Sequence, residues 1–365
     1  MIRSGISVET GLPVEIEFDT HIRAIRPGED RNRFVAPAFL DIQVNGFAGV
    51  DYNSGATPRD EIVRSADAIR RTGVARFFPT VITAPPEDMV AALRNLAQAP
   101  DRSIEGFHIE GPHLSPEDGP RGAHPLASIR PPDLAEYRRW QDAAAGRIRL
   151  ITVSPHWPHA ALYIEELVSD GVTVSIGHTH ATSQQISDAS AAGATMSTHL
   201  GNAAHAVIRK QPNYIWDQLA DDRLTASFIA DGIHLGRAFL KSAMRAKTAE
   251  RTVLVTDASS PAAAAPGLYR LGQQEIALLE DGRVVLAGTD RLAGSALQMH
   301  DAIANAMQMA ELPLIDAVRM ATVNPAGAVR MSERQRGLII GERADLVFFT
   351  LDQGRLNIQE TIVSN

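Results

Sequence analysis

The feature that most constrains the fold is a repeated pattern in which a short apolar run precedes a segment with helical periodicity, eight times in succession. Strands that alternate with helices in this way build a parallel sheet, because each helix carries the chain back to the start of the next strand. Eight such units are the number that a closed (β/α)₈ barrel needs. We therefore predict an α/β TIM barrel whose strands occupy residues 39–45, 76–83, 104–110, 149–154, 172–178, 195–199, 225–231 and 252–257.

The segments around these strands carry recognisable signals. The first helix is predicted to begin at Thr57, a good N-cap, with Pro58 at its first position, and to stop at Gly73. After the last barrel strand, residues 267–286 are typical of a hairpin, and two helices are expected at 295–309 and 313–322.

Both ends of the chain are predicted to form strands. Polar and apolar residues alternate at 14–18 and 21–25, and the tail at 337–349 is again strand-like. Strands at both ends of a barrel indicate one small β module built from the two termini. We therefore expect a small β domain of residues 1–36 and 335–365 and a barrel domain of residues 37–334.

Composition and charge exclude several classes of protein. The 365 residues contain no cysteine, so thiolate metal sites and a cysteine nucleophile are excluded. The net charge of −8 argues against general nucleic-acid binding, which needs a basic face. We find no signal-peptide core and no apolar run near the ~18 residues of a membrane helix, so we expect a cytoplasmic protein that does not bind membranes.

Polar, ligand-capable side chains stand repeatedly at the predicted strand ends, where the active site of a TIM barrel lies. Any one of them is explained equally well as a hydrogen-bonded core residue or a turn residue. Together they are hard to explain by packing, because each buried polar group without a partner costs ~1–3 kcal/mol. The strand-end residues are Gln43, Asn45, His108, Glu110, His178, His180, His199, Asp231, His234 and Asp257.

Glu110, His178 and His199 are the best candidate metal ligands among these residues. One carboxylate and two imidazoles suit Zn²⁺ or a similar divalent ion, and three protein ligands leave a position open for water. The pKa of such a water falls from ~15.7 to about 7. Asp257 is then the natural general base for that water, and it can later pass the proton to a leaving nitrogen.

At these residues the sequence resembles the N-acetylglucosamine-6-phosphate deacetylases of the amidohydrolase superfamily. The resemblance runs almost end to end and rests on the order and spacing of many short motifs. They lie at residues 37–46, 108–112, 122–124, 177–179, 198–200, 229–234, 255–258, 292–295, 324–326 and 341–346.

The resemblance implies a (β/α)₈ barrel with a β-sandwich made from both termini, and hydrolysis of an N-acetyl group to acetate and a free amine. It implies that Glu110, His178 and His199 hold the metal and that Asp257 is the acid/base. His124 would help to polarise the acetyl carbonyl and steady the oxyanion. The residues implied to contact the sugar or its phosphate are His234, Asn202 and the Ala203 backbone.

The number of metals follows from the first strand. Many amidohydrolases carry His-x-His there, which supports a second metal, whereas this chain has Gln43-Val44-Asn45. Amides bind divalent transition metals weakly, and some deacetylases of the family share this substitution. We therefore expect one divalent metal ion per subunit, Zn²⁺ in first place, with Fe²⁺, Mn²⁺ and Co²⁺ as alternatives.

The phosphate-binding loop departs from the family pattern. The family usually has Gly-Arg-Glu-Pro-Gly, whose arginine reaches the phosphate in the neighbouring subunit, whereas this chain has Ile208-Arg209-Lys210-Gln211-Pro212-Asn213. Lys210 occupies the arginine position if Pro212 is the anchor, and a lysine offers no planar fork for bidentate binding unless Arg209 substitutes. The resemblance of this loop predicts a homodimer.

Three readings follow. In the first, the enzyme acts on N-acetylglucosamine-6-phosphate. In the second, it acts on a different N-acyl substrate, which is another or an unphosphorylated amino sugar or an N-acyl amino acid. A third, non-enzymatic reading is a barrel that only binds ligands, although such proteins usually lose the metal ligands or the acid/base residue. The sequence also leaves open whether His113, next to the Glu110 motif, belongs to the site.

Overall fold

A computed structural model describes residues 1–332, 334 and 336–364. Eight parallel strands form one sheet, in which each strand pairs with the next along the chain. Past its last strand the sheet closes on its first, because the Asn45 amide donates to the Ala258 carbonyl at 2.7 Å and the Asp257 amide donates to Gln43 at 3.0 Å. The predicted TIM barrel is thus confirmed. Its strands are β5 (Phe39–Val44), β8 (Val74–Ile82), β9 (Phe107–Glu110), β10 (Ile148–Val153), β11 (Thr173–Ile176), β12 (Met196–Ser197), β13 (Thr225–Phe228) and β14 (Thr252–Leu254).

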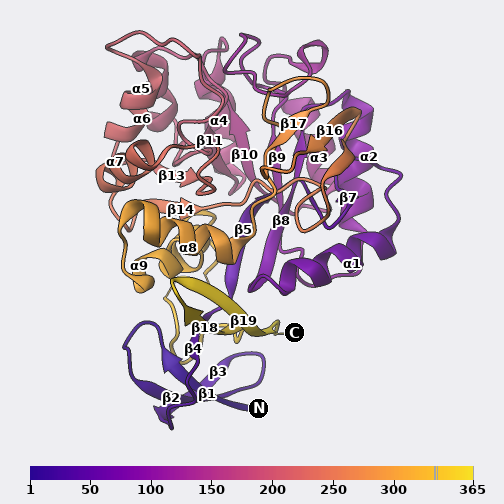
Figure 1. Cartoon of the computed structure of the whole chain (residues 1–365). Coiled ribbons are helices and arrows are strands. Elements are labelled where there is room, and N and C mark those ends of the chain that lie inside the picture. Colours follow the sequence, from indigo (N-terminus) through magenta and orange to yellow (C-terminus); the bar gives the residue numbers. More distant parts are fainter. Residues whose placement is uncertain (333, 335, 365) are drawn as a thin grey trace.

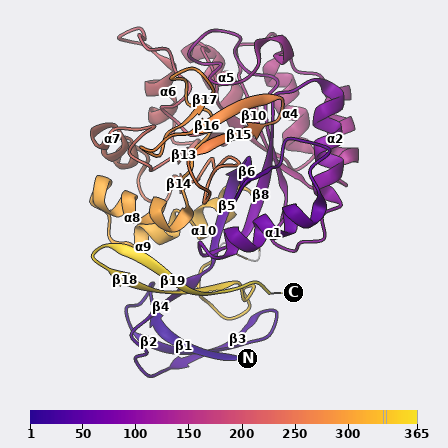
Figure 2. The same ribbon diagram turned by 45° about the vertical axis from the view of Figure 1, so that its right-hand side comes forward.

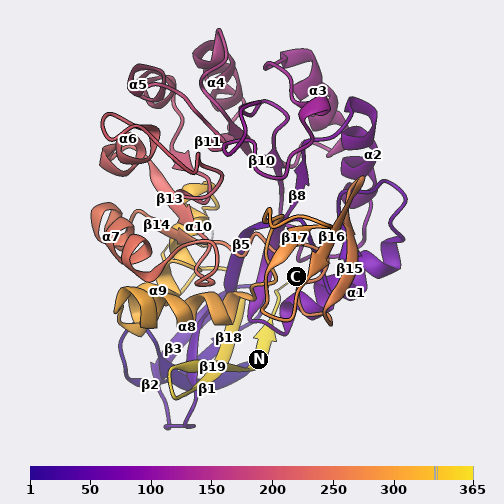
Figure 3. The same cartoon turned by 45° about the horizontal axis from the view of Figure 1, so that its top comes forward.

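Helices surround the barrel as an outer ring, which Figure 3 shows from above. Several begin at side-chain caps, such as Thr182, which forms a capping box with Gln185. The helices are α1 (Arg59–Arg70), α2 (Pro86–Ala97), α3 (Leu134–Ala143), α4 (Ala160–Ser169), α5 (Ser183–Ala191), α6 (Tyr214–Ala220), α7 (Arg237–Lys247), α8 (Met299–Ala310), α9 (Leu314–Arg319) and α10 (Val323–Ala328), with a 3₁₀ turn at Leu126–Ser128. Within the described chain, none of them is long and apolar enough to cross a membrane.

Three local predictions need correction. Helix α1 begins at Arg59 and not at Thr57, because the Thr57 hydroxyl donates to the Asp51 carbonyl at 2.8 Å and caps no helix. Helix α8 begins at Met299, since Ser295 is held to the barrel through Asp257. The tail pairs from Leu346 onward as β18 (Leu346–Asp352) and β19 (Arg355–Ile362). Helix α6, which follows the sixth barrel strand, had no predicted bounds, and helix α10 was not predicted.

The two termini build one six-stranded sheet at the base of the barrel, where Figure 1 places both chain ends. Its order is β19-β18-β4-β1-β2-β3. Strands from both halves share one small core, which includes Ile16, Val35 and Phe348. This confirms the predicted small β domain from both termini, while its division from the barrel near residues 36 and 335 remains our proposal. The N-terminal strands are β1 (Ile2–Ser7), β2 (Pro13–Phe18), β3 (Ile22–Pro27) and β4 (Phe34–Pro37).

A third sheet covers part of the barrel opening (Figure 2). It consists of β15 (Gly267–Leu271), β16 (Gln274–Leu278) and β17 (Val284–Leu286). The hairpin predicted at residues 267–286 therefore forms, with a third strand added to it. Its apolar side chains pack on Ile82, at the end of β8, and on Ala123. We call residues 267–294 the cover segment. A short ribbon of β6 (Gly46–Phe47) and β7 (Val50–Asp51) follows β5.

Candidate active site

The carboxyl ends of the barrel strands bring the predicted metal-binding and catalytic residues into one pocket. Glu110 ends β9, and His178, His199 and Asp257 stand in the turns that follow β11, β12 and β14. Because parallel strands all end at the same face, residues far apart in sequence meet there. The pocket is lined by Asn45, Ile82, Glu110, Gly122, Ala123, His124, His178, His199, Asn202, Ala203, Ile229, His234, Asp257, Leu271, Leu292 and Gly294.

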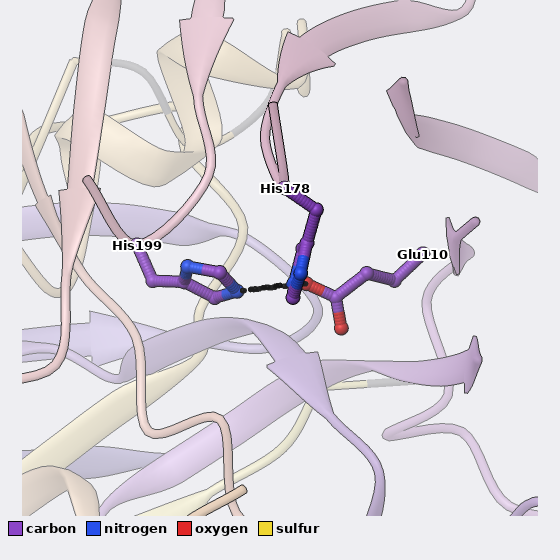
Figure 4. A group of neighbouring side chains, drawn as sticks. All are labelled: Glu110, His178 and His199. Atoms are coloured by element: carbon purple, nitrogen blue, oxygen red, sulfur yellow. Dashed lines mark hydrogen bonds and ion pairs between the residues drawn. The ribbon is translucent and has the colours of Figure 1, made fainter. Parts of the chain in front are cut away.

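Three of these side chains point toward one another, as Figure 4 shows. The Glu110 Oε1 atom lies 2.9 Å from His199 Nε2 and 3.2 Å from His178 Nε2, and the two Nε2 atoms are 3.2 Å apart. All three residues are buried. An ion with ligands at about 2.0–2.2 Å in tetrahedral geometry separates its donor atoms by about 3.3–3.6 Å. The observed spacing is close to that value.

The hydrogen bonding of His178 gives an independent reason to place a cation here. Its Nδ1 lies 2.9 Å from the Pro120 carbonyl oxygen, which only accepts, so the ring proton is on Nδ1. In the neutral ring the Nε2 lone pair then faces the Glu110 carboxylate. Two lone pairs at this distance repel unless a cation lies between them or the ring gains a second proton. The donor set and its tautomer therefore fit a divalent metal ion.

The backbone at the site is unusual. His178, His199 and Asp257 have φ of 47°, 28° and 50°, in the left-handed region that residues other than glycine rarely adopt. These values end the regular strand pairing two or three residues before our predicted strand ends at 178, 199 and 257. The left-handed turn lets each side chain leave the barrel wall and face the pocket.

Asp257 lies beside the three candidate ligands. Its Oδ1 accepts from Gln43 Nε2 at 3.1 Å and from Asn45 Nδ2 at 2.7 Å. Gln43 also donates to Glu110 Oε1 at 2.9 Å, so one amide joins both carboxylates. Burial raises the pKa of Asp257 to about 6, with the Glu110 charge as the second cause. Gln43 and Asn45 thus hydrogen-bond to site carboxylates, as their amide chemistry allows.

His124 packs edge-on against His178, with 4.4 Å between the ring centroids. Burial, and next the neighbouring His178, lower the pKa of His124 to about 3, so the ring is neutral at physiological pH. Its Nδ1 is buried and has no partner in the part of the chain that the structure describes. A proton on this buried nitrogen would have no acceptor, so the ring proton is placed on Nε2. The Nε2–H group can then donate a hydrogen bond to a ligand in the pocket.

The predicted substrate-binding residues divide into two groups. His234, Asn202 and Ala203 line the pocket, and His234 Nδ1 is bonded to Asp231 Oδ2 at 2.6 Å. Arg209 lines a separate hollow together with Glu117, His180 and His205, and Lys210 lines neither. Among the described residues, no lysine or arginine of the same subunit lines the pocket.

Three histidines near the motifs lie outside the pocket. His113 is fully buried between Trp140 and Tyr163, with Nδ1 3.1 Å from the Arg130 carbonyl, and belongs to the packing between barrel and helices. His108 is also buried, and its Nε2 meets Thr152 at 2.8 Å. His180 faces the hollow of Arg209.

Residues of the cover segment were not predicted as part of the site. Leu271 and Leu292 reach the pocket from residues that follow the last barrel strand. Ile82 and Ile229 add apolar surface from β8 and the end of β13. Their sequence signal is weak, because apolar residues at strand ends are common in any barrel.

Comparison with known proteins decides the family. The sequence profile of the amidohydrolase family matches residues 34–364 of the chain. The chain belongs to the amidohydrolase family. This match confirms the family that the motifs indicated. Individual deacetylases are also similar to the chain.

This amidohydrolase is 33% identical to an N-acetylglucosamine-6-phosphate deacetylase of Danio rerio, over 96% of the chain and 88% of the relative. It is 32% identical to an N-acetylgalactosamine-6-phosphate deacetylase of Escherichia coli O157:H7, over 89% and 85%. Among solved structures, it resembles an Asp-to-Ala mutant of N-acetyl-D-glucosamine-6-phosphate deacetylase from Mycobacterium smegmatis, in complex with N-acetyl-D-glucosamine-6-phosphate. That match has 32% identity and a TM-score of 0.89 and covers 100% and 99% of the two chains.

Proposed function

We propose that this amidohydrolase removes the N-acetyl group of an amino sugar phosphate, in first place N-acetylglucosamine-6-phosphate, which gives glucosamine-6-phosphate and acetate. The observation that carries the proposal is the buried group of Glu110, His178 and His199 with Asp257 beside it. The names of the similar deacetylases support the choice of substrate.

Glu110, His178 and His199 would hold one divalent ion, for which we propose Zn²⁺, with Fe²⁺, Mn²⁺ and Co²⁺ as alternatives. Such an ion, when bound, polarises a carbonyl and makes hydroxide available near neutral pH. The two amides of Gln43 and Asn45 are already bonded to Asp257, which fits one metal better than two.

Asp257 would take the proton from the attacking water while the water oxygen bonds to the acetyl carbon. The same carboxyl would then give this proton to the nitrogen as the carbon–nitrogen bond breaks. His124, neutral in its buried setting, would donate a hydrogen bond to the carbonyl oxygen, where negative charge develops. The products are acetate and the free amine.

The distant end of the substrate would meet His234, Asn202 and the Ala203 backbone, all of which line the pocket. A phosphate needs cationic partners, and the described pocket has no lysine or arginine of its own. We therefore propose a homodimer in which Arg209 and Lys210 serve the neighbouring subunit. A cytoplasmic location stays a prediction from the sequence.

The absence of a lysine or arginine from the described lining of the pocket also favours one alternative substrate class, the unphosphorylated N-acetyl amino sugars. An N-acyl amino acid has no comparable support in the pocket. A barrel that only binds ligands is disfavoured by the intact set of Glu110, His178, His199 and Asp257.

The test is acetate release by zinc-loaded protein. N-acetylglucosamine-6-phosphate, N-acetylgalactosamine-6-phosphate and their unphosphorylated forms are offered at equal concentration. Fast release from the first supports the proposal, and fast release from an unphosphorylated sugar alone transfers the function to that class. No release from any of the four, with one metal bound per chain, rejects amino sugar deacetylation.

A further inference from the structure

The loop that carries His124 supports two groups of the site at once. The Pro120 carbonyl accepts the Nδ1 proton of His178 at 2.9 Å, four residues before His124. Gly122 lies against the same ring, since a side chain carbon added there would come 3.2 Å from His178 Cε1. The path of residues 120–124 therefore sets the positions of His124 and of the His178 ring.

Two side chains of the cover segment hold this loop by its carbonyls. Gln274 Nε2 donates to the Ala123 carbonyl at 2.7 Å, and Arg291 Nη1 donates to the Gly122 carbonyl at 3.0 Å. Arg291 also forms an ion pair with Asp118 at 2.5 Å. Because a carbonyl only accepts, the amide orientation of Gln274 is fixed, with its nitrogen toward Ala123.

The tip of the β15–β16 hairpin is itself anchored to the barrel. Leu271 pairs with Gln274 across the two-residue turn of Gly272 and Gln273, and Leu271 lines the pocket. The Gly272 amide donates to Asp51 at 2.8 Å and ties the tip to the ribbon that follows β5, whereas the exposed Gln273 side chain bonds to Asp88 at the surface. Gln274 thus acts from a fixed support, and one hairpin both covers the pocket and holds the loop.

We infer that Gln274 is a positioning residue for amide hydrolysis. It holds the Ala123–His124 peptide so that the His124 ring lies within hydrogen-bonding reach of the substrate carbonyl. The inference rests on the proposed function, since it assumes that His124 serves the reaction. Without the Gln274 amide, the Ala123 carbonyl loses its donor and the Ala123–His124 peptide can shift, while Arg291 still holds Gly122 on the side of the loop that supports His178. A displacement of about 1 Å at a catalytic group can reduce the rate by about 100-fold.

The first experiment compares two neighbouring glutamines in the zinc-loaded full-length protein. Gln274→Met keeps the length of the side chain and removes its donor. It should lower kcat for the best N-acetyl amino sugar by roughly 10-fold or more, with KM and bound zinc unchanged. Gln273→Met, the control, removes only the exposed bond to Asp88, keeps the Gly272–Asp51 bond that anchors the hairpin tip, and should keep the wild-type kcat.

A double-mutant cycle separates positioning from general destabilisation. If Gln274 acts through His124, then Gln274→Met should change kcat by less than about 2-fold in the His124→Ala background. Equal losses in both backgrounds overturn the inference, and so does an unchanged kcat in Gln274→Met. Gln274→Glu, which cannot donate when ionised at pH 8, repeats the cycle if the methionine variant does not fold. Failure of the wild type to release acetate rejects the proposed function instead.

Discussion

The substitution Asp257→Asn tests the proposed reaction at its acid/base residue. In the structure, Asp257 Oδ1 accepts from both Gln43 and Asn45, at 3.1 and 2.7 Å. An asparagine retains this oxygen and can keep both hydrogen bonds, so the side chain should stay in place. The other carboxylate oxygen becomes an NH₂ group, which cannot take a proton from water. The variant therefore removes proton transfer and little else.

The expected loss follows from what a positioned general base contributes, about 100- to 10,000-fold in rate, or about 3–5 kcal/mol in activation free energy. Metal binding should change little, because the three donor atoms that face one another belong to Glu110, His178 and His199 and not to Asp257. Removal of a charge near Glu110 would slightly weaken attraction for the cation, so excess zinc is included in the assay.

The assay measures kcat for acetate release at pH 8 together with zinc content per chain. The reasoning requires a loss of at least about 100-fold in kcat with close to one zinc per chain. A variant that keeps its zinc and turns over within about 10-fold of the wild type would show that another group moves the proton. Loss of the metal along with activity would mean that Asp257 serves as a ligand, which the proposed roles do not allow.

Three further perturbations test the metal ligands, the buried ion pair beside the terminal sheet and the proposed phosphate-binding residues. Glu110→Gln removes the anionic donor between two imidazoles, so zinc affinity measured by competition with a chelator should fall by about 10-fold or more; unchanged affinity would contradict the ligand assignment. Asp345→Leu removes the nearer of the two carboxylates that face the buried Arg76 guanidinium, at 3.0 Å, and leaves only Glu105 at 3.6 Å. Urea unfolding should therefore show a loss of about 3 kcal/mol, whereas a loss below about 1 kcal/mol would mean that water or Glu105 replaces the lost carboxylate. The double variant Arg209→Ala and Lys210→Ala should raise KM for phosphorylated substrates alone; an equal rise for an unphosphorylated sugar would show that this loop does not read the phosphate.

The prediction of the fold and the candidate site succeeded where the signal was local. The eight strand–helix units follow from hydrophobic periodicity over about 4 to 18 residues, a scale on which neighbours in sequence are also neighbours in space. Strand ends of a parallel barrel must meet at one face, so Glu110, His178, His199 and Asp257 were grouped before their distances were known.

Local rules did not decide the role of a residue that depends on a distant partner, so the sequence left the role of His113 open. His113 and His124 both stand near the Glu110 motif, but one packs between Trp140 and Tyr163 while the other reaches the pocket. The strand ends at 178, 199 and 257 were placed too far along the chain, because periodicity does not reveal a left-handed turn in a residue other than glycine.

The sequence by itself therefore determined the barrel, the β domain shared by the termini and the types of side chain at the opening of the barrel. Only the tertiary structure decided which nitrogen of His178 is free, since that depends on Pro120, and that the cover segment holds the His124 loop, since Ala123 and Gln274 are 151 residues apart. The physical reason is that a hydrogen bond is short and directional. Its formation depends on the packed path of two distant backbones, and no pattern within either segment records it.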